Sequence, residues 1–250
     1  MGKVYLVGAG PGAVDLLTVR AARLLGEADI VFHDALIGED VLSLAPHAEK
    51  VAVGKRCGAH STTQRFINKR LVDAAAKYGM VVRLKGGDPM LFGRAQEEID
   101  ALEASGVDVE VVPGITAALA ASADLKRSLT RRGVARSVAF VTPRIGEGED
   151  VADWCDAAAA ADTVAIYMGA GDAEAVAKAL IARGRLPSTP VALIENASRA
   201  DRAVMSGTLA TLPALAAARG GGPALIVVGE VVRDVAVEAA VELERRYAAR

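Results

Sequence analysis

The chain has 250 residues, and 52% of them are hydrophobic, so it can bury one large core or two cores of ordinary domain size. Its 29 Lys and Arg and 31 Asp and Glu leave a formal net charge of -2, which excludes a general attraction to nucleic acid or to an anionic membrane. We therefore expect no nucleic acid and no membrane as partners.

Short β-rich runs alternate with longer helical stretches in both halves of the chain. In the first half, strands are expected at 4–7, 29–32, 49–53, 80–84 and 107–112, with helices at 17–25, 62–78 and 94–104. In the second half, strands are expected at 137–141, 163–168, 190–194, 202–207 and 224–229, with helices at 173–183, 209–218 and from Val231. This alternation predicts an α/β fold whose strands are joined by helical crossovers.

Segment 123–136, "ADLKRSLTRRGVAR", breaks the alternation with charged residues and a Gly. We therefore predict two α/β domains, residues 1–120 and residues 121–250.

The 2 cysteines, Cys57 and Cys155, lie far apart, and the chain has only 3 His. This usage argues against a metal site or a disulfide framework and favours a cytoplasmic location. Lys3, Gly-Pro-Gly and Asp15 interrupt the first residues, so we expect no signal peptide. No later run approaches the ~20 apolar residues of a membrane-spanning helix.

The first predicted strand ends in Gly8-Ala9-Gly10-Pro11-Gly12-Ala13, which fits the pattern G-x-G-x-x-(G/A) of dinucleotide-binding turns. A phosphate cradle needs successive backbone N–H groups, and Pro11 removes one of them. Pro11 therefore argues against a pyrophosphate ligand. A tight turn between strand and helix, without a ligand, is the alternative.

Two further loops follow predicted strands in the first half: "RLKGGDPMLFG" at 83–93 and "VVPGITAA" at 111–118, where Thr116 is placed to cap a helix. Several glycine-rich turns at strand ends suggest one small ligand held from several sides by main chain. Turn formation alone is again the alternative for each loop.

These loops also carry a resemblance to a known family. The segments GAGPGAVDLLTVRA, GKRCGAHSTTQRFIN (54–68), RLKGGDPMLFG, EVVPGITAA and IYMG (166–169) follow one another along nearly the whole chain. Together they resemble the tetrapyrrole methylase family, and most closely its branch that methylates uroporphyrinogen III.

The resemblance implies two α/β domains with S-adenosylmethionine in a cleft between them, no metal, and a homodimer. It also implies the transfer of two methyl groups to uroporphyrinogen III, giving precorrin-2 for sirohaem and cobalamin biosynthesis. A methylase of a later corrin intermediate, a methylase resembling diphthine synthase, and a nucleotide-binding oxidoreductase or ligand sensor are the alternatives.

The resemblance also implies site residues. The cofactor contacts would be Pro11, Gly86, Gly87, Asp88, Leu91, Thr116, Ala117, Met168 and Ala197. Asp34 would be the proton acceptor and Lys55 the proton donor. The residues alone leave other interpretations open: Met168 as core, Asp88 as a turn residue, Asp34 as a helix cap and Lys55 as a solvated lysine.

A basic run offers binding groups for the eight carboxylates of uroporphyrinogen III. It consists of Lys126, Arg127, Arg131, Arg132 and Arg136, with no acid between them. Arginine binds carboxylates in bidentate fashion, so we predict that several of these residues line the mouth of the cleft. A solvated basic face is the alternative. The run falls where the chain departs from the family pattern, in "KRSLTRR" at 126–132, which leaves the details of substrate contact open.

Overall fold

The computed structural model describes residues 1–54, 64–145 and 154–235. The chain divides into two compact units, Met1–Ala117 and Ala118–Arg250. Each unit contains a 5-stranded sheet with helices packed on it, so the predicted α/β fold class is confirmed.

The sheet of the first unit is parallel throughout, with the strand order β3-β2-β4-β1-β5. Its strands are β1 (Lys3–Gly8), β2 (Ile30–His33), β3 (Glu49–Ala52), β4 (Met80–Lys85) and β5 (Val109–Val112). The central strands β1 and β4 are buried on both faces, which explains their nearly continuous apolar runs.

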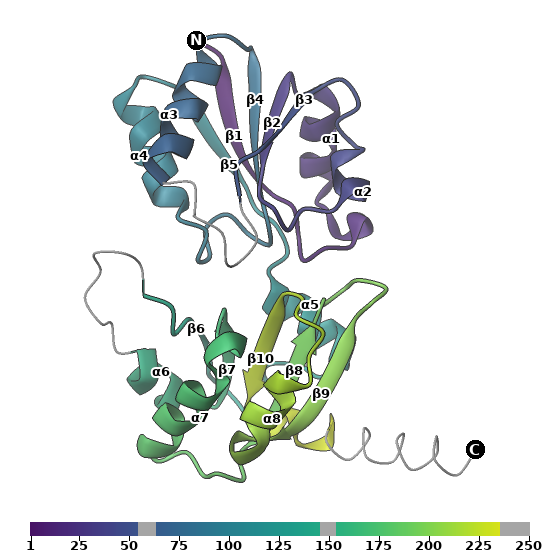
Figure 1. Ribbon diagram of the computed structural model, residues 1–250, viewed down its shortest axis with the longest axis vertical. Coiled ribbons are helices and arrows are strands. Elements are labelled where there is room, and N and C mark those ends of the chain that lie inside the picture. Colours follow the sequence, from purple (N-terminus) through teal and green to yellow (C-terminus); the bar gives the residue numbers. More distant parts are fainter. Residues whose placement is uncertain (55–63, 146–153, 236–250) are drawn as a thin grey trace. The chain divides into compact units, whose positions relative to one another are not determined.

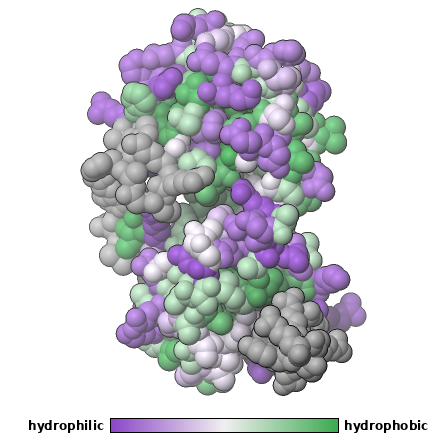
Figure 2. Space-filling view, turned by 45° about the vertical axis from the view of Figure 1, so that its right-hand side comes forward, coloured by the Kyte–Doolittle hydropathy of each residue, from purple (hydrophilic) through white to green (hydrophobic). Residues whose placement is uncertain are grey.

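Helices cover both faces of this sheet (Figure 1). Helices α1 (Val19–Glu27) and α2 (Glu39–Leu42) pack on one face, and α3 (Gln64–Ala75) and α4 (Ala95–Ala104) pack on the other. The Thr18 side chain accepts a hydrogen bond from the backbone N–H of Ala21 and caps α1. Most charged residues of these helices are exposed, and Figure 2 shows hydrophilic and apolar side chains mixed over the visible face.

The sheet of the second unit has the order β6-β7-β10-β8-β9. Its strands are β6 (Val138–Val141), β7 (Thr163–Tyr167), β8 (Pro190–Glu195), β9 (Ala203–Thr208) and β10 (Ala224–Val228). One face packs against α6 (Trp154–Ala160), α7 (Ala173–Ala182) and α8 (Leu212–Ala217), and the other against α5 (Ala117–Leu125).

The prediction that helical crossovers join the strands is wrong for part of this second sheet. Strand β10 runs antiparallel to both β7 and β8, and β8 runs antiparallel to β9. Segment 196–202, which joins β8 to β9, is too short for a crossover, which takes a dozen or more residues.

The described helices are each too short or too polar to cross a bilayer. Within the same described ranges, the fold does not gather three His, Cys, Asp or Glu side chains in a position to bind a metal ion.

Candidate active site

The topology of the first sheet indicates a ligand site at the carboxyl ends of its strands. From β1 the chain crosses to β2 and β3, returns to β4 between β2 and β1, and then passes to β5 on the other side of β1. The connections that leave the neighbouring strands β1 and β4 therefore run in opposite directions. Open α/β sheets bind ligands at the carboxyl ends of such a pair of strands.

Three loops meet at these carboxyl ends, namely the loops that follow β1, β4 and β5. Gly10 and Gly87 form an antiparallel bridge, in which the Gly10 N–H donates to the Gly87 carbonyl at 3.2 Å and the Gly87 N–H to the Gly10 carbonyl at 2.7 Å. The loop after β5 packs on both of the others: a Cβ added to Gly114 would overlap the Gly87 carbonyl oxygen and lie 2.8 Å from Gly8 Cα. Only glycine permits this approach of three backbones.

Asp88 ties two of these loops together. One carboxylate oxygen accepts a hydrogen bond from the Met90 N–H at 2.8 Å, and the other from the Gly114 N–H at 2.9 Å. The first bond closes a local turn, and the second reaches the loop after β5. Asp88 therefore positions the loops, and its contact with a cofactor remains a prediction.

The other predicted contacts of the first unit lie on the same loops. Pro11 and Leu91 are half-buried, and Thr116 is buried. Gly86 is exposed, and a Cβ added there would have no atom within 4 Å. The structure thus leaves open space beside Gly86, while it packs Gly8, Gly87 and Gly114 tightly together.

Asp34 follows β2 and lies beside these loops. Its Oδ1 accepts a hydrogen bond from Arg83 Nη2 at 2.5 Å, and its Oδ2 faces the Gly86 N–H at 3.4 Å. The helix-cap interpretation of Asp34 is wrong, because the next helix, α2, begins at Glu39 with Gly38 as its N-cap.

Arg83 belongs to a buried group of charges that the sequence analysis missed. Glu98 on α4, with no exposed surface, accepts hydrogen bonds from Arg83 Nε at 3.1 Å and Lys85 Nζ at 2.9 Å. Gln64 on α3 donates to the same carboxylate at 3.1 Å. The run "RLK" near the end of a strand buried on both faces was the available signal, because charged residues there need partners.

The pKa values of the two buried cations shift in opposite directions. Desolvation lowers the pKa of Arg83, but the charges of Asp34 and Glu98 outweigh it and hold the pKa above its ordinary value. Burial lowers the pKa of Lys85, the charge of Arg83 acts in the same direction, and Glu98 offsets this only in part.

Lys55, the predicted proton donor, lies outside the described residues, as do the other residues from 56 to 63 of the motif that contains it. The described end of this motif reaches the charge group through Gln64.

The remaining predicted cofactor contacts lie at the start of α5 and in the second unit. Ala117 opens α5 and is half-buried. Met168 follows β7 with a φ of 57° and an exposed fraction of 44%, so the interpretation of Met168 as core is wrong. A methionine in this left-handed conformation is uncommon and marks a constrained position. Ala197 follows β8 and is buried.

The basic run begins where α5 ends. Lys126, Arg131, Arg132 and Arg136 are exposed, and Arg127 is half-buried. Arg131 Nη1 lies 3.7 Å from an Asp234 carboxylate oxygen, with both side chains more than half exposed. Such a pair contributes little to stability and leaves the guanidinium accessible to another anion.

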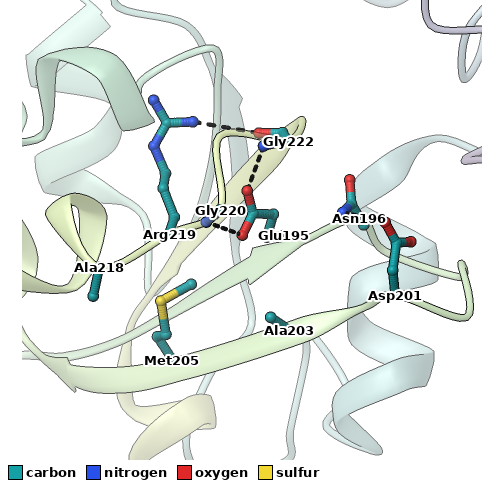
Figure 3. A pocket seen from close by; sticks show the side chains of 9 residues that line it. All are labelled: Glu195, Asn196, Asp201, Ala203, Met205, Ala218, Arg219, Gly220 and Gly222. Carbon is teal, nitrogen blue, oxygen red and sulfur yellow. Dashed lines mark hydrogen bonds between the residues drawn. The ribbon is translucent and has the colours of Figure 1, made fainter.

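A separate pocket of about 540 Å³ lies in the second unit (Figure 3). The buried carboxylate of Glu195 accepts hydrogen bonds from the backbone N–H groups of Gly220, at 2.8 Å, and Gly222. Asn196 donates to Asp201 at 2.9 Å. These polar groups satisfy one another, and we assign the pocket no ligand.

The described geometry defines a class of protein: a two-domain α/β protein with a candidate ligand site built from glycine-rich backbone and one flanking carboxylate. The sequence profile of the family Tetrapyrrole (Corrin/Porphyrin) Methylases matches residues 3–213. The chain belongs to this family, as its motifs predicted.

Among the curated relatives is a protein of Serratia proteamaculans (strain 568) named siroheme synthase 1. It is 47% identical over 232 residues, which are 92% of this chain and 48% of that protein. A siroheme synthase of Pseudomonas fluorescens (strain Pf0-1) is 47% identical over 93% of this chain and 50% of its own length. The chain spans about half the length of these relatives.

Solved structures share the fold over nearly the whole chain. A uroporphyrin-III C-methyl transferase from Thermus thermophilus, complexed with S-adenyl homocysteine, is 42% identical with a TM-score of 0.80, over 93% of this chain and 94% of that one. A cobalt precorrin-4 methyltransferase is 30% identical with a TM-score of 0.80, over 92% and 95%.

Proposed function

We propose that the protein is an S-adenosylmethionine-dependent C-methyltransferase that converts uroporphyrinogen III to precorrin-2 by two methyl transfers. The observation that carries the proposal is the meeting of three glycine-rich loops, with Asp34 beside them, at the carboxyl ends of β1, β4 and β5. The structural relative from Thermus thermophilus, which contains S-adenyl homocysteine, supports the choice of cofactor.

The residues at this edge fit such a cofactor. The open space beside Gly86 admits a ligand close to the backbone, and Pro11, Leu91 and Thr116 offer small or apolar surface around it. We propose that Gly86, Gly87, Asp88 and Ala117 complete the contacts of the first unit, and that Met168 and Ala197 contribute those of the second. When bound, S-adenosylmethionine supplies a methyl group on a positively charged sulfur.

The chain's own residues then orient the reactants and accept a proton. A pyrrole ring is electron-rich at carbon, so strong base activation of the substrate is not required. Well-aligned reactants gain effective molarities of ~10⁵–10⁸ M, or roughly 7–11 kcal/mol of barrier. We therefore assign the larger share of the rate to the loops that hold the cofactor, and a smaller share to Asp34 as proton acceptor and Lys55 as donor.

The basic run supports a polyacidic substrate. Lys126, Arg131, Arg132 and Arg136 are exposed, and an arginine can hold a carboxylate by two hydrogen bonds. A protein side chain, as a methylase resembling diphthine synthase would take, offers no comparable set of anions.

The relative that methylates cobalt precorrin-4 favours a second candidate, methylation of a later corrin intermediate. Anaerobic incubation with S-adenosylmethionine and, in separate reactions, uroporphyrinogen III or a later corrin intermediate, followed by mass and absorbance of the product, separates the two. We expect a gain of two methyl groups. A folded protein that methylates only a later corrin intermediate would establish the second candidate, and one that yields no methylated product would refute both.

A thermal-shift assay tests the remaining alternative, a nucleotide-binding oxidoreductase. A saturating ligand stabilises its target by a few kcal/mol through mass action. We expect stabilisation by S-adenosylhomocysteine and none by NAD, and the reverse would favour an oxidoreductase. We also propose a homodimer in the cytoplasm, as the family resemblance implies, and light scattering of the purified protein tests the dimer.

A further inference from the structure

The buried charge group of the first unit runs from the interior of the sheet to the candidate site. The Glu98 side chain is 0% exposed, that of Arg83 is 4% exposed, and that of Asp34 is 32% exposed. Only the last member therefore opens toward solvent and ligand. The group holds two carboxylates, Asp34 and Glu98, and two cations, Arg83 and Lys85, so it carries no net charge.

Every nitrogen of the Arg83 guanidinium has a hydrogen-bond partner. Nη2 donates to Asp34 at 2.5 Å, Nε to Glu98 at 3.1 Å, and Nη1 to the Leu84 carbonyl at 3.0 Å. Three hydrogen bonds fix the orientation of the planar Arg83 guanidinium, and its bond to Asp34 Oδ1 therefore fixes the position of that oxygen. The second oxygen of Asp34 is left beside the Gly86 N–H and the open space there.

Glu98 holds this fork in place from the other side. Its Oε1 accepts from Arg83 and from Gln64, and its Oε2 accepts from Lys85. A buried ion pair adds little stability compared with apolar residues of the same volume. The energetic contribution of the group to folding therefore does not account for these buried charges.

We propose that Arg83 and Glu98 are positioning residues that hold the Asp34 carboxylate in the orientation in which it accepts the substrate's proton. The inference rests on the function proposed above. Neither residue touches the substrate, since both are buried, and each acts through Asp34 alone.

A double-mutant cycle tests this coupling. The first variant is Arg83→Lys, which keeps the charge but cannot bind both carboxylates in one plane. We expect its kcat to fall by about tenfold or more when Asp34 is present, a part of the roughly 10²–10⁴-fold that a general acid or base typically contributes. In an Asp34→Asn background we expect the same substitution to change kcat by less than about twofold, because its effect passes through Asp34. The KM for S-adenosylmethionine should stay unchanged in all of these proteins.

Glu98→Gln tests the same coupling independently. The new amide places an NH₂ donor against Arg83 or Lys85, where the carboxylate accepted a hydrogen bond. If either single variant fails to fold, the triple variant Arg83→Met, Lys85→Met and Glu98→Met replaces it, since it removes the buried charges together. Leu102→Ala is the matched control: it lies on the same helix, α4, is fully buried, and destabilises the unit without touching the charges.

The outcomes separate the two proposals. A cycle in which the loss of kcat is equal in the wild-type background and in the Asp34→Asn background would overturn the positioning role and leave the methyltransferase activity standing. So would an equal loss in Leu102→Ala, which would show that destabilisation alone explains the effect. A wild-type protein that forms no methylated product would instead remove the proposed function, and the positioning role with it.

Discussion

Replacing Gly114 with alanine should damage both the fold of the first unit and its binding edge. The new Cβ would overlap the Gly87 carbonyl oxygen and lie 2.8 Å from Gly8 Cα. Both neighbours are backbone, and the Gly10–Gly87 bridge holds one of them in place, so no side-chain rotation relieves the clash.

The magnitude follows from the contacts that must change. Overpacking costs about 1–3 kcal/mol, and a loop that moves away also loses the Gly114–Asp88 hydrogen bond, worth about 1.5–3 kcal/mol for a charged acceptor. We expect a loss of about 3 kcal/mol or more. For a unit of this size, that lowers the melting temperature by about 10 °C.

Gly86→Ala is the matched control at the same edge. Its Cβ would have no atom within 4 Å, so the stability should change by no more than the roughly ±0.5 kcal/mol usual for surface substitutions. If the open space there holds the cofactor, calorimetry should show at least about a tenfold loss of affinity for S-adenosylhomocysteine, or about 1.4 kcal/mol. Circular dichroism measures the stability of both variants. A Gly114→Ala protein as stable as wild type would refute the close packing, and unchanged binding by Gly86→Ala would move the cofactor elsewhere.

Asp34→Ala should retain more activity than a protein whose cofactor site is blocked, because orientation supplies the larger share of the rate, and equal inactivity in steady-state assays would reverse that ranking. Replacement of Arg131 and Arg132 together by Ala should raise the KM for uroporphyrinogen III more than the KM for S-adenosylmethionine, and an equal change in both, or none, would remove these residues from the substrate site. Hydrogen bonds from the Arg136 N–H and from the Ser137 hydroxyl and N–H hold the pKa of Asp162 below its ordinary value, so its contribution to stability is present above the unfolded pKa and is lost as pH falls through the folded one. Asp162→Asn should therefore lower the melting temperature more at about pH 7 than at about pH 3, and an equal loss at both values would contradict this account.

The positions of the strands could be read from the sequence because they depend on local apolar runs. All of the predicted strands overlap strands of the structure, from β1 (Lys3–Gly8) to β10 (Ala224–Val228). Their directions in the second unit could not be read in this way. The antiparallel pairs of β10 with β7 and β8 depend on which strands meet in space, and no local pattern encodes that.

The site shows the same division between local and distant information. The glycine-rich turns after β1 and β4 were predictable from the residues, since glycine permits a close approach of backbone. The partner of Asp34 was not, because Arg83 lies 49 residues away along the chain. Met168 was open to interpretation as core, and only its exposure and left-handed backbone separate it from its buried neighbours in β7.

Two different sets of contacts therefore meet at the carboxyl ends of β1 and β4. Close backbone packing at Gly8, Gly87 and Gly114, together with the Asp88 carboxylate that accepts from the Gly114 N–H, forms the loops that would hold the cofactor. The Arg83 guanidinium orients Asp34 through a charged and directional hydrogen bond. Both sets of contacts include Gly86, whose N–H faces Asp34 and whose other side is open. A cofactor bound in that open space would therefore lie close to the oriented Asp34 carboxylate. That arrangement would bring one substrate within reach of both the methyl donor and the proton acceptor.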